Sequence, residues 1–518
     1  MELNRPAAPR RPVRLAEVVG VLSLAADLGS GATFEHGLRT CLVALRVVER
    51  AGGDNEAMRS AYWASLLRLI GCNSTAHTLA ALIGDELAPA AWFGAIDFAD
   101  PRQLLGRMLA NVGAGEAPIA RLARLARVLG SLPSMRTDLR AHCEVALLLA
   151  RRLPLPEAER ELLGYLFERW NGVGPRGLRG ESTPFVARAV TFAHDVATWC
   201  DFAPRQDLLP EMRRRAGRTT DPDLVALLDR DGSILEPLEL ETAWDAVLEA
   251  EPGSPRWLAG EDLDEALVCV AEFADMKIAS ASTHSSRVAR LVAEGAREAG
   301  LRAGPAATLS RAALLHDVGR SGISAGVWDL PRPLRAGEWE QVRLHPHYTD
   351  RVLAPAAGLQ EEAQVAPLSA ERVDGSGYHR RLNGAALPLT ARLLAAADVF
   401  AALGEDRPHR AALPIRGAVE RLRDEAREGR LDPDAVAAVL RCAGEAGEPP
   451  RRRLPAGLTE REAEVLGLIA TGLSNRAVAG RLNVAEKTVG NHVQHVYEKI
   501  GVTTRAAATL FAVQHGLV

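Results

Sequence analysis

The chain has 518 residues, of which 47% are hydrophobic, 25% charged and 4% aromatic, and its formal net charge is −4. This length predicts about three domains, and the composition is that of a folded globular protein, which excludes a disordered chain and a polycation. No run of ~20 apolar residues predicts a membrane span, and six scattered cysteines without CxxC spacing favour a reduced, cytoplasmic protein over a disulfide or zinc framework.

The predicted elements begin after a polar lead. Residues 1–14 lack the apolar core of a signal sequence, and we expect a short disordered segment there. Beyond it, alanine, leucine and arginine dominate the composition, which favours helices over sheets. We therefore predict an all-α protein.

The sequence contains one pattern twice. Residues 168–196 align without gaps on residues 371–399, an offset of 203, and LLRLIG at 66–71 aligns on LLHDVG at 314–319, an offset of 248. Internal similarity of this kind indicates duplicated structural units. The change of offset implies about 45 additional residues in the first copy. We predict two homologous helical units and a turn-rich joint: repeat 1 at 13–245, with the additional residues between 72 and 141, a linker at 246–261, and repeat 2 at 262–445.

The alignment also weakens two motif-like matches in repeat 1. GVGPRG at 172–177 satisfies GxGxxG, but it contains Pro175 and lacks a strand–turn–helix context, which argues against dinucleotide binding. The pair His194–Asp195 looks like a second HD pair. In the repeat frame, however, His194 aligns with Ala397, so the dipeptide alone indicates little.

Repeat 2 carries ligand-type side chains at the ends of predicted helices. His284 lies in STHSSRVARLVAEGA, whose apolar residues have helical spacing, His316–Asp317 ends ALLHDVG, and Asp398 lies in ARLLAAADVFAAL. Two imidazoles and two carboxylates suit Mn, Fe, Zn or Mg without selecting one of them. We predict one divalent ion, held by His284, His316, Asp317 and Asp398.

These residues, followed by DGSGYH, resemble the HD superfamily of metal-dependent phosphohydrolases, specifically its HD-GYP branch, over most of 262–445. The resemblance implies an α-helical bundle in which two or three metals activate a water that hydrolyses cyclic di-GMP, because metals lower the pKa of bound water and offset phosphate charge. It also implies a catalytic role for Asp317 with the metal-bound water, and a further metal contact by His345.

Repeat 2 departs from this branch around the second metal. The branch carries His–His–Glu before its Asp-Gly-x-Gly-Tyr segment, whereas Ser369–Ala370 precede Glu371 here. His379 stands where the branch has the proline of its GYP motif, and Arg320 stands where the branch has a lysine after the HD glycine. The four ligands for one ion survive while those for a second are lost, which argues against hydrolysis of cyclic di-GMP.

Repeat 1 keeps the frame but loses more of the ligands. The HD pair is replaced by Arg68–Leu69 and the His–His pair by Leu166–Phe167, and Arg68 is expected to place a cation near the vacated ion position. We therefore predict no metal in repeat 1. Three ligand-type residues remain there: His36, His142 and Asp195.

Residues 457–518 have the pattern of a small helical domain that follows a basic, proline-rich linker at 446–456. Thr459 and Glu462 form a capping box that opens a helix. Further along, Ser474 caps a second helix, and the third is predicted at 486–500.

The third predicted helix has two opposite faces. At 100° per residue its valines fall on one arc, and a lysine and two amides fall on the opposite arc. Lysine and amide side chains read base edges in the major groove, and polar residues that flank them bind phosphates. We predict contacts with double-stranded DNA as follows: Lys487, Asn491 and Gln494 at base edges, and Thr488, His495 and Lys499 at phosphates.

Over some 60 residues this region resembles the LuxR-type helix-turn-helix domain, through Gly501 and Thr504–Arg505. The resemblance implies that the third helix enters the major groove and that a fourth helix, at about 505–515, forms a homodimer. Ala485 stands where a capping Ser or Thr is usual, at a cost of about 1 kcal/mol, and Gly490 replaces a commonly basic residue.

The charge of this domain is modest. From residue 457 onward six Lys/Arg face five Asp/Glu, and Arg451–Arg453 raise the total to +4. Such a charge predicts modest non-specific affinity for DNA and a useful contribution from dimerisation.

Three functions fit these patterns. The first is a DNA-binding transcriptional regulator whose tandem HD-like units sense a signal or mediate assembly, away from any membrane. The second is a metal-dependent phosphohydrolase of a phosphodiester or nucleotide, with an appended DNA-binding domain. A third possibility treats repeat 2 as a unit that binds a nucleotide ligand without turnover. The Ser369–Ala370 replacement favours the first.

Overall fold

The computed structural model describes residues 12–93, 96–97, 100–131, 135–278, 283–384, 386–443, 454–515 and 517–518. Within these residues the secondary-structure elements are helices apart from β1 (Val13–Arg14) and β2 (Trp257–Leu258), which pair antiparallel. The predicted all-α class is confirmed. The polar lead up to residue 11 and Arg451–Arg453 of the linker lie outside the described residues.

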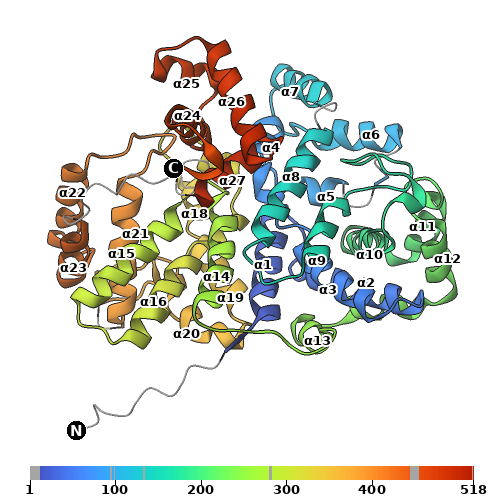
Figure 1. Cartoon of the computed structure of the whole chain (residues 1–518), viewed down its shortest axis with the longest axis horizontal. Helices are drawn as coiled ribbons and strands as arrows, with labels where there is room; N and C mark the ends of the chain where they lie inside the picture. The colour runs from blue at the N-terminus through green and yellow to red at the C-terminus, as the bar shows by residue number, and fades with distance from the viewer. Residues whose placement is uncertain are drawn as a thin grey trace, which may run out of the picture.

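Repeat 1 occupies the right of the molecule in Figure 1. Its additional residues form four helices at the top and centre of this lobe: α4 (Ala76–Ile83), α5 (Pro89–Phe93), α6 (Pro101–Asn111) and α7 (Pro118–Ser131). The remaining helices are α1 (Leu15–Ser30), α2 (His36–Arg50), α3 (Asn55–Leu67), α8 (Met135–Ala150), α9 (Glu157–Glu161), α10 (Phe185–Phe202), α11 (Leu208–Arg215), α12 (Pro222–Arg230) and α13 (Trp244–Glu249).

Repeat 2 occupies the left of the same view. A short 3₁₀ helix, η7 (Val318–Gly322), follows its HD pair. The α-helices are α14 (Gly260–Asp275), α15 (His284–Glu298), α16 (Ala303–Leu315), α17 (Ala325–Trp328), α18 (Ala336–Val342), α19 (His345–Leu353), α20 (Gln360–Ala363), α21 (Leu389–Leu403), α22 (Ile415–Arg427) and α23 (Pro433–Ala443).

The same local contact starts the second helix of each repeat. Asp27 accepts a hydrogen bond from the backbone N–H of Gly37 at 3.0 Å, and Asp275 accepts one from Ser285 at 2.9 Å, 248 positions later in both cases. A carboxylate in this place satisfies a backbone donor of the first helical turn that lacks an intrahelical partner. The contact therefore positions the first residues of α2 and α15, which are His36 and His284.

The two repeats pack around one continuous apolar core. Helix α1 of repeat 1 packs against α14 and η7 of repeat 2, and Asn73 Nδ2 donates to the Phe273 carbonyl at 2.8 Å. Glu86, between α4 and α5, pairs with Lys277 Nζ at 2.7 Å, and Lys277 is completely buried. Repeat 1 thus supports the side of repeat 2 on which the HD pair lies.

The C-terminal domain lies at the top of Figure 1 and comprises α24 (Glu460–Ala470), α25 (Asn475–Leu482), α26 (Glu486–Ile500) and α27 (Arg505–Gln514). Its local signals act as predicted. Thr459 and Glu462 form the capping box, with the Glu462 N–H bonded to Thr459 Oγ1 at 3.2 Å. Ser474 caps α25, whereas Ala485 gives α26 no side-chain cap.

Among the residues that the structure describes, no single helix is long and apolar enough to cross a membrane. The segments Asn55–Ser74 and Ala76–Ile83, bent by 59° at the break between them, pass this test only when taken together.

Candidate metal centre and nucleic-acid interface

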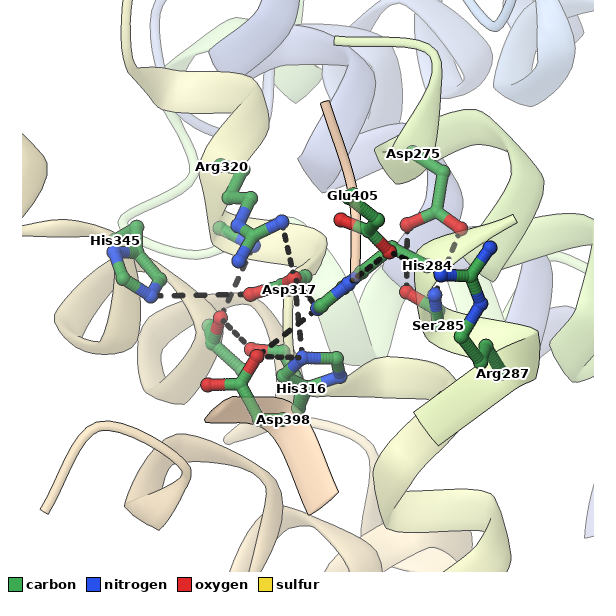
Figure 2. Close-up of polar contacts among 12 residues, drawn as sticks. Asp275, His284, Ser285, Arg287, His316, Asp317, Arg320, His345, Asp398 and Glu405 are labelled. Atoms are coloured by element: carbon green, nitrogen blue, oxygen red, sulfur yellow. Dashed lines mark hydrogen bonds and ion pairs between the residues drawn. The ribbon is translucent and has the colours of Figure 1, made fainter. Parts of the chain in front are cut away.

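Four predicted ligands of repeat 2 converge at one point (Figure 2). His284 is the first residue of α15, His316 and Asp317 follow the end of α16, and Asp398 lies on α21. One ligand atom from each of the four residues lies within 4.8 Å of every other. The sequence separation of these helices means that the tertiary fold, and not local chain geometry, creates the cluster.

The imidazole Nε2 atoms face the carboxylates. His284 Nε2 lies 3.0 Å from Asp398 Oδ1 and 3.3 Å from Asp317 Oδ2. His316 Nε2 lies 3.1 Å from Asp317 Oδ2 and 3.7 Å from Asp398 Oδ1. His284, His316 and Asp317 are at most 1% exposed. Nitrogen and oxygen donors in this number and spacing form a compact set suited to a divalent cation.

The opposite nitrogen of each histidine is fixed by an acceptor. His284 Nδ1 lies 2.9 Å from Glu405 Oε1, and His316 Nδ1 lies 2.7 Å from the Ala313 carbonyl. When Nδ1 carries the proton and donates to these acceptors, Nε2 keeps its lone pair. Metal-binding histidines in proteins are held in this way. Sequence reasoning missed Glu405, which lies beyond the motif residues and after the end of α21.

The charges of the cluster are incompletely satisfied by the protein. Burial opposes the ionised form of Asp317, yet Arg320 and His316 hold the pKa of its carboxyl below the ordinary value. Burial also opposes protonation of His316, but Asp317 and Asp398 raise its pKa to about 10. The Asp317 oxygens and His316 Nε2 lie within ion-pair distance of neighbouring groups, but among the described residues none of them has a hydrogen bond of good geometry. Buried donor and acceptor atoms without such hydrogen bonds fit a divalent ion. Binding of that ion would release protons from the cluster.

The second-metal side of the cluster is less complete. His345 Nε2 lies 3.8 Å from Asp317 Oδ1, with its Nδ1 2.7 Å from the Val342 carbonyl, so this histidine faces the other oxygen of the same carboxylate. Arg320 Nη1 lies 2.6 Å from Asp317 Oδ2. Ser369 and Ala370 are buried and carry no imidazole. The structure therefore brings His345 to the cluster without the second histidine pair.

The two glycine-containing loops have an internal structural role. Glu371 accepts backbone hydrogen bonds from Arg380 at 2.7 Å and Leu382 at 2.9 Å. Glu168, its counterpart in repeat 1, accepts one from Leu178 at 2.9 Å. A buried glutamate organises each loop, and the GVGPRG segment lies in a loop without flanking strands.

The equivalent place in repeat 1 is filled by protein groups. His36 Nδ1 lies 2.7 Å from Asp201 Oδ2, and its Nε2 lies 3.0 Å from His194 Nδ1. Asp195 is paired with Arg169. Arg68 is turned toward the Leu166 carbonyl, and its guanidinium lies 4.5 Å from the centre of the Phe167 ring. The cation beside Asp195 thus comes from Arg169, a residue that the sequence reasoning did not single out.

The predicted DNA-contacting face of α26 is free of the protein interior. Val489 and Val496 are buried, whereas the six predicted contact residues are all exposed. Gln494 Nε2 bonds Glu498 Oε1 at 3.2 Å. Lys499 Nζ lies 2.7 Å from Glu462 Oε2, so this lysine is partly occupied within the domain. The exposed set consists of Lys487, Thr488, Asn491, Gln494, His495 and Lys499.

Helix α27 packs within the chain. It lies against α8 of repeat 1, and Ala508, Leu510 and Ala512 are completely buried. The preceding turn is tied to the same helix, because Thr504 Oγ1 donates to Glu144 Oε2 at 2.9 Å. Gln514 Nε2 lies 3.3 Å from the Leu148 carbonyl. The helix that the resemblance assigns to dimerisation is therefore occupied by an intramolecular contact.

Comparisons with known families agree with this two-part organisation. Residues 269–435 match the HD domain, and residues 456–512 match the bacterial regulatory proteins of the luxR family. HD phosphodiesterases depend on metals, and the LuxR-type match implies DNA binding.

Individual relatives cover different shares of the chain. The 3'3'-cGAMP-specific phosphodiesterase 3 of Vibrio cholerae is 28% identical over 439 residues, which are 83% of this chain and 94% of the relative. The probable transcriptional regulatory protein NarL of Mycobacterium tuberculosis is 43% identical over 99 residues, 16% of this chain and 46% of the relative. A crystal structure of a cyclic GMP-AMP specific phosphodiesterase from V. cholerae covers 84% of this chain and 99% of its own, with a TM-score of 0.58 and 24% identity, and so shows a common fold.

Proposed function

We propose that this chain acts as a DNA-binding transcriptional regulator. An HD domain precedes a LuxR-type helix-turn-helix domain in it, and it is homologous to HD-GYP cyclic GMP-AMP phosphodiesterases. Its tandem HD-like units serve as the sensory or assembly module. The observation that carries the proposal is the exposed polar face of α26, on which Lys487, Asn491 and Gln494 lie opposite the buried valines.

The contact of α27 with α8 supports a means of regulation. LuxR-type domains are expected to pair through this helix, and here it packs against α8 of repeat 1 as well as against α24 of its own domain. A change in the repeats that weakens the Glu144 contact frees α27 for a second copy of the chain. Dimerisation then doubles the number of DNA contacts and raises affinity.

DNA binding is tested by selecting genomic fragments bound by the purified protein and measuring retention of the best fragment at fixed salt. Lys487→Ala and Asn491→Ala are each expected to weaken binding by about tenfold, since one base contact is worth ~1–3 kcal/mol. Arg416→Ala, which removes an exposed cation from α22, controls for charge. Equal retention by all variants, with folding intact, would contradict the choice of α26.

The four-ligand cluster supports a second function, hydrolysis of a phosphodiester. His284, His316, Asp317 and Asp398 would hold one divalent cation, either Mn, Fe, Zn or Mg, which would act as a Lewis acid and lower the pKa of a water beside it. Asp317, between the histidines and Arg320, would help to hold the cation and would orient that water. The similarity to a cGAMP phosphodiesterase makes cyclic dinucleotides the first substrates to test.

An activity assay separates the two functions. Purified protein loaded with Mn²⁺, Fe²⁺, Zn²⁺ or Mg²⁺ is incubated with 3'3'-cGAMP and cyclic di-GMP, and products are separated by chromatography. The regulatory proposal expects no turnover above that of His316→Ala. Metal-dependent turnover abolished by His316→Ala would instead establish the hydrolase. A thermal shift with either nucleotide but no turnover would identify repeat 2 as a nucleotide sensor.

A further inference from the structure

Repeat 1 contains a cavity of about 450 Å³ beside the position that corresponds to the ligand cluster of repeat 2. His36, Leu69 and Asp195 line it, and their positions in the sequence repeat are those of three ligand-type residues in repeat 2. Protein sites for small molecules commonly have volumes of ~300–1,000 Å³. The cavity therefore has the size and the place of a binding site, in the repeat that has lost its HD pair.

The chemistry of this cavity differs from that of a metal site. The side chain of Leu69 replaces a carboxylate, Arg169 neutralises Asp195, and the imidazole of His194 occupies the Nε2 side of His36 at 3.0 Å. Burial and the cations Arg68 and Arg169 hold the pKa of His194 well below its ordinary value, so this ring stays neutral. The centre of the former site has become a closed hydrogen-bonded group.

The residues added to repeat 1 give the cavity an apolar roof. Apart from Ser131 at the end of α7, helices α4, α6 and α7 contribute aliphatic side chains and a methionine to this part of the lining. Covering such a wall with an apolar ligand removes hydrocarbon surface from water, which favours binding. The roof consists of Leu79, Leu82 and Ile83 on α4, Leu104 and Met108 on α6, and Val128 on α7.

A small polar part of the lining restricts the ligand further. Arg215 Nε pairs with Glu211 Oε1 at 2.6 Å, so the two arginines of the wall, Arg169 and Arg215, are both matched by carboxylates. Thr198 Oγ1 and Arg215 Nη2 are buried and have no hydrogen-bond partner among the described residues. Because both arginines are paired, an anionic ligand would lose hydration without a counter-ion. An oxygen acceptor would satisfy the unpartnered donors after a small adjustment of the wall.

We propose that repeat 1 binds a neutral, largely apolar small molecule with an oxygen acceptor at one end, in the cavity lined by Leu69, Leu82 and Thr198. The inference deepens the sensory role given above to the tandem units. Its test measures ligand binding alone, so its failure is distinguishable from a failure of DNA binding. Glu86, which follows the roof helix α4, pairs with Lys277 of repeat 2, so the roof lies next to a contact between the two repeats.

The full-length protein is titrated with Nile red, a neutral apolar dye with a carbonyl group, and its fluorescence is followed. Saturable binding of one dye per chain is expected. Decan-1-ol is expected to displace the dye at least tenfold better than decanoate at pH 8, because burial of the carboxylate is unfavourable. Equal displacement by the two compounds would overturn the assignment of a neutral ligand, and absence of saturable dye binding would overturn the site.

Two substitutions locate the dye. Ala90→Trp places an indole in the cavity and is expected to weaken binding at least tenfold. Leu69→Asn adds an amide of similar size to the floor and is expected to weaken binding about fivefold, which keeps the test decisive if the larger residue disturbs folding. Ala411→Trp, in a separate cavity next to the C-terminal domain, is the control. Dye affinity that falls only in the control variant would place the ligand elsewhere and overturn the proposal.

Discussion

The His36 site of repeat 1 and the His284 site of repeat 2 have the same outer frame and different centres. Each histidine is held through Nδ1 by a carboxylate, Asp201 at 2.7 Å and Glu405 at 2.9 Å. The Nε2 atom of His284 faces two carboxylates, whereas that of His36 faces His194. The difference teaches that the outer hydrogen bonds also serve the packing of α2 and α15, and so they persist when the ligands at the centre change.

The largest expected effect concerns the ligands at the centre of the repeat 2 site. Asp398→Ala removes a carboxylate from the four-ligand cluster and is expected to reduce metal retention by at least about 100-fold, since loss of a ligand costs several kcal/mol of binding free energy. Asp195→Ala, the matched change in repeat 1, is expected to leave retention unchanged because Asp195 is already paired with Arg169. Metal content per chain is measured by elemental analysis after dialysis. Equal loss in both variants would refute the assignment of the ion to repeat 2.

A second prediction concerns the buried contact through which repeat 1 supports repeat 2. Lys277→Met leaves Glu86 buried beside Ser324 without its cation, and breaking such a pair costs ~3–5 kcal/mol of unfolding free energy. Lys277 holds the pKa of the Glu86 carboxyl below its ordinary value despite burial. The unfolding midpoint in guanidinium chloride measures the loss.

The matched control for this prediction is a solvent-exposed ion pair. Arg213→Ala breaks the pair with Asp229, in which the arginine side chain is 58% exposed and the aspartate side chain 41%. Such pairs contribute at most ~1 kcal/mol to the free energy of unfolding. A loss in Lys277→Met no larger than this control would mean that the two repeats are stabilised independently.

A third prediction uses the two aligned histidines, His142 and His345. Burial lowers the pKa of each imidazole to about 4. For such a group stability is fully present above the unfolded-state value of 6.5 and is lost as pH falls toward 4, because the unfolded chain takes up the proton first. When the pH falls from 7 to 5, His142 alone is expected to lower the free energy of unfolding by ~2 kcal/mol.

His142→Gln isolates this contribution in the repeat that is predicted to lack metal. Glutamine can still donate to the Arg68 carbonyl, which accepts from His142 Nε2 at 2.9 Å, but it does not titrate. The variant is therefore expected to lose less stability than the wild type when thermal unfolding is compared at pH 7 and pH 5. An identical pH dependence in the two proteins would show that His142 is not the group responsible.

Much of the scaffold was predictable because it depends on local signals that repeat. The capping box at Thr459 and the turn before α26 follow from short sequence patterns, and the order of the four ligands follows from the duplicated frame. Glu405 and Arg169 were not predictable in the same way. Their contacts join residues far apart in the chain or depend on side-chain direction, which no local pattern encodes. The same holds for His194, whose sequence match to Ala397 gives no indication that its ring would meet His36.

The smallest expected effect concerns α8, the counterpart in repeat 1 of α19. Helix α8 contacts the C-terminal domain. Helix α8 carries the C-terminal domain through Glu144, which accepts hydrogen bonds from Thr503 and Thr504. Glu144→Ala removes these partly exposed bonds, each worth ~0.5–1.5 kcal/mol, and is expected to release α27 and raise DNA affinity by up to about tenfold. Gel-shift titration measures the affinity, and sedimentation measures the dimer fraction.

Removing a negative charge also favours DNA binding by itself, so Glu157→Ala on the neighbouring helix α9 is the control for charge. An increase confined to Glu144→Ala, with more dimer, supports intramolecular capture of α27 by repeat 1. An equal increase in both variants reduces the effect to electrostatics, and a decrease would mean that the α8 contact orders the domain for binding. In the last case repeat 1, which is predicted to bind no metal, would hold the DNA-binding domain in a position that favours DNA binding instead of one that prevents it.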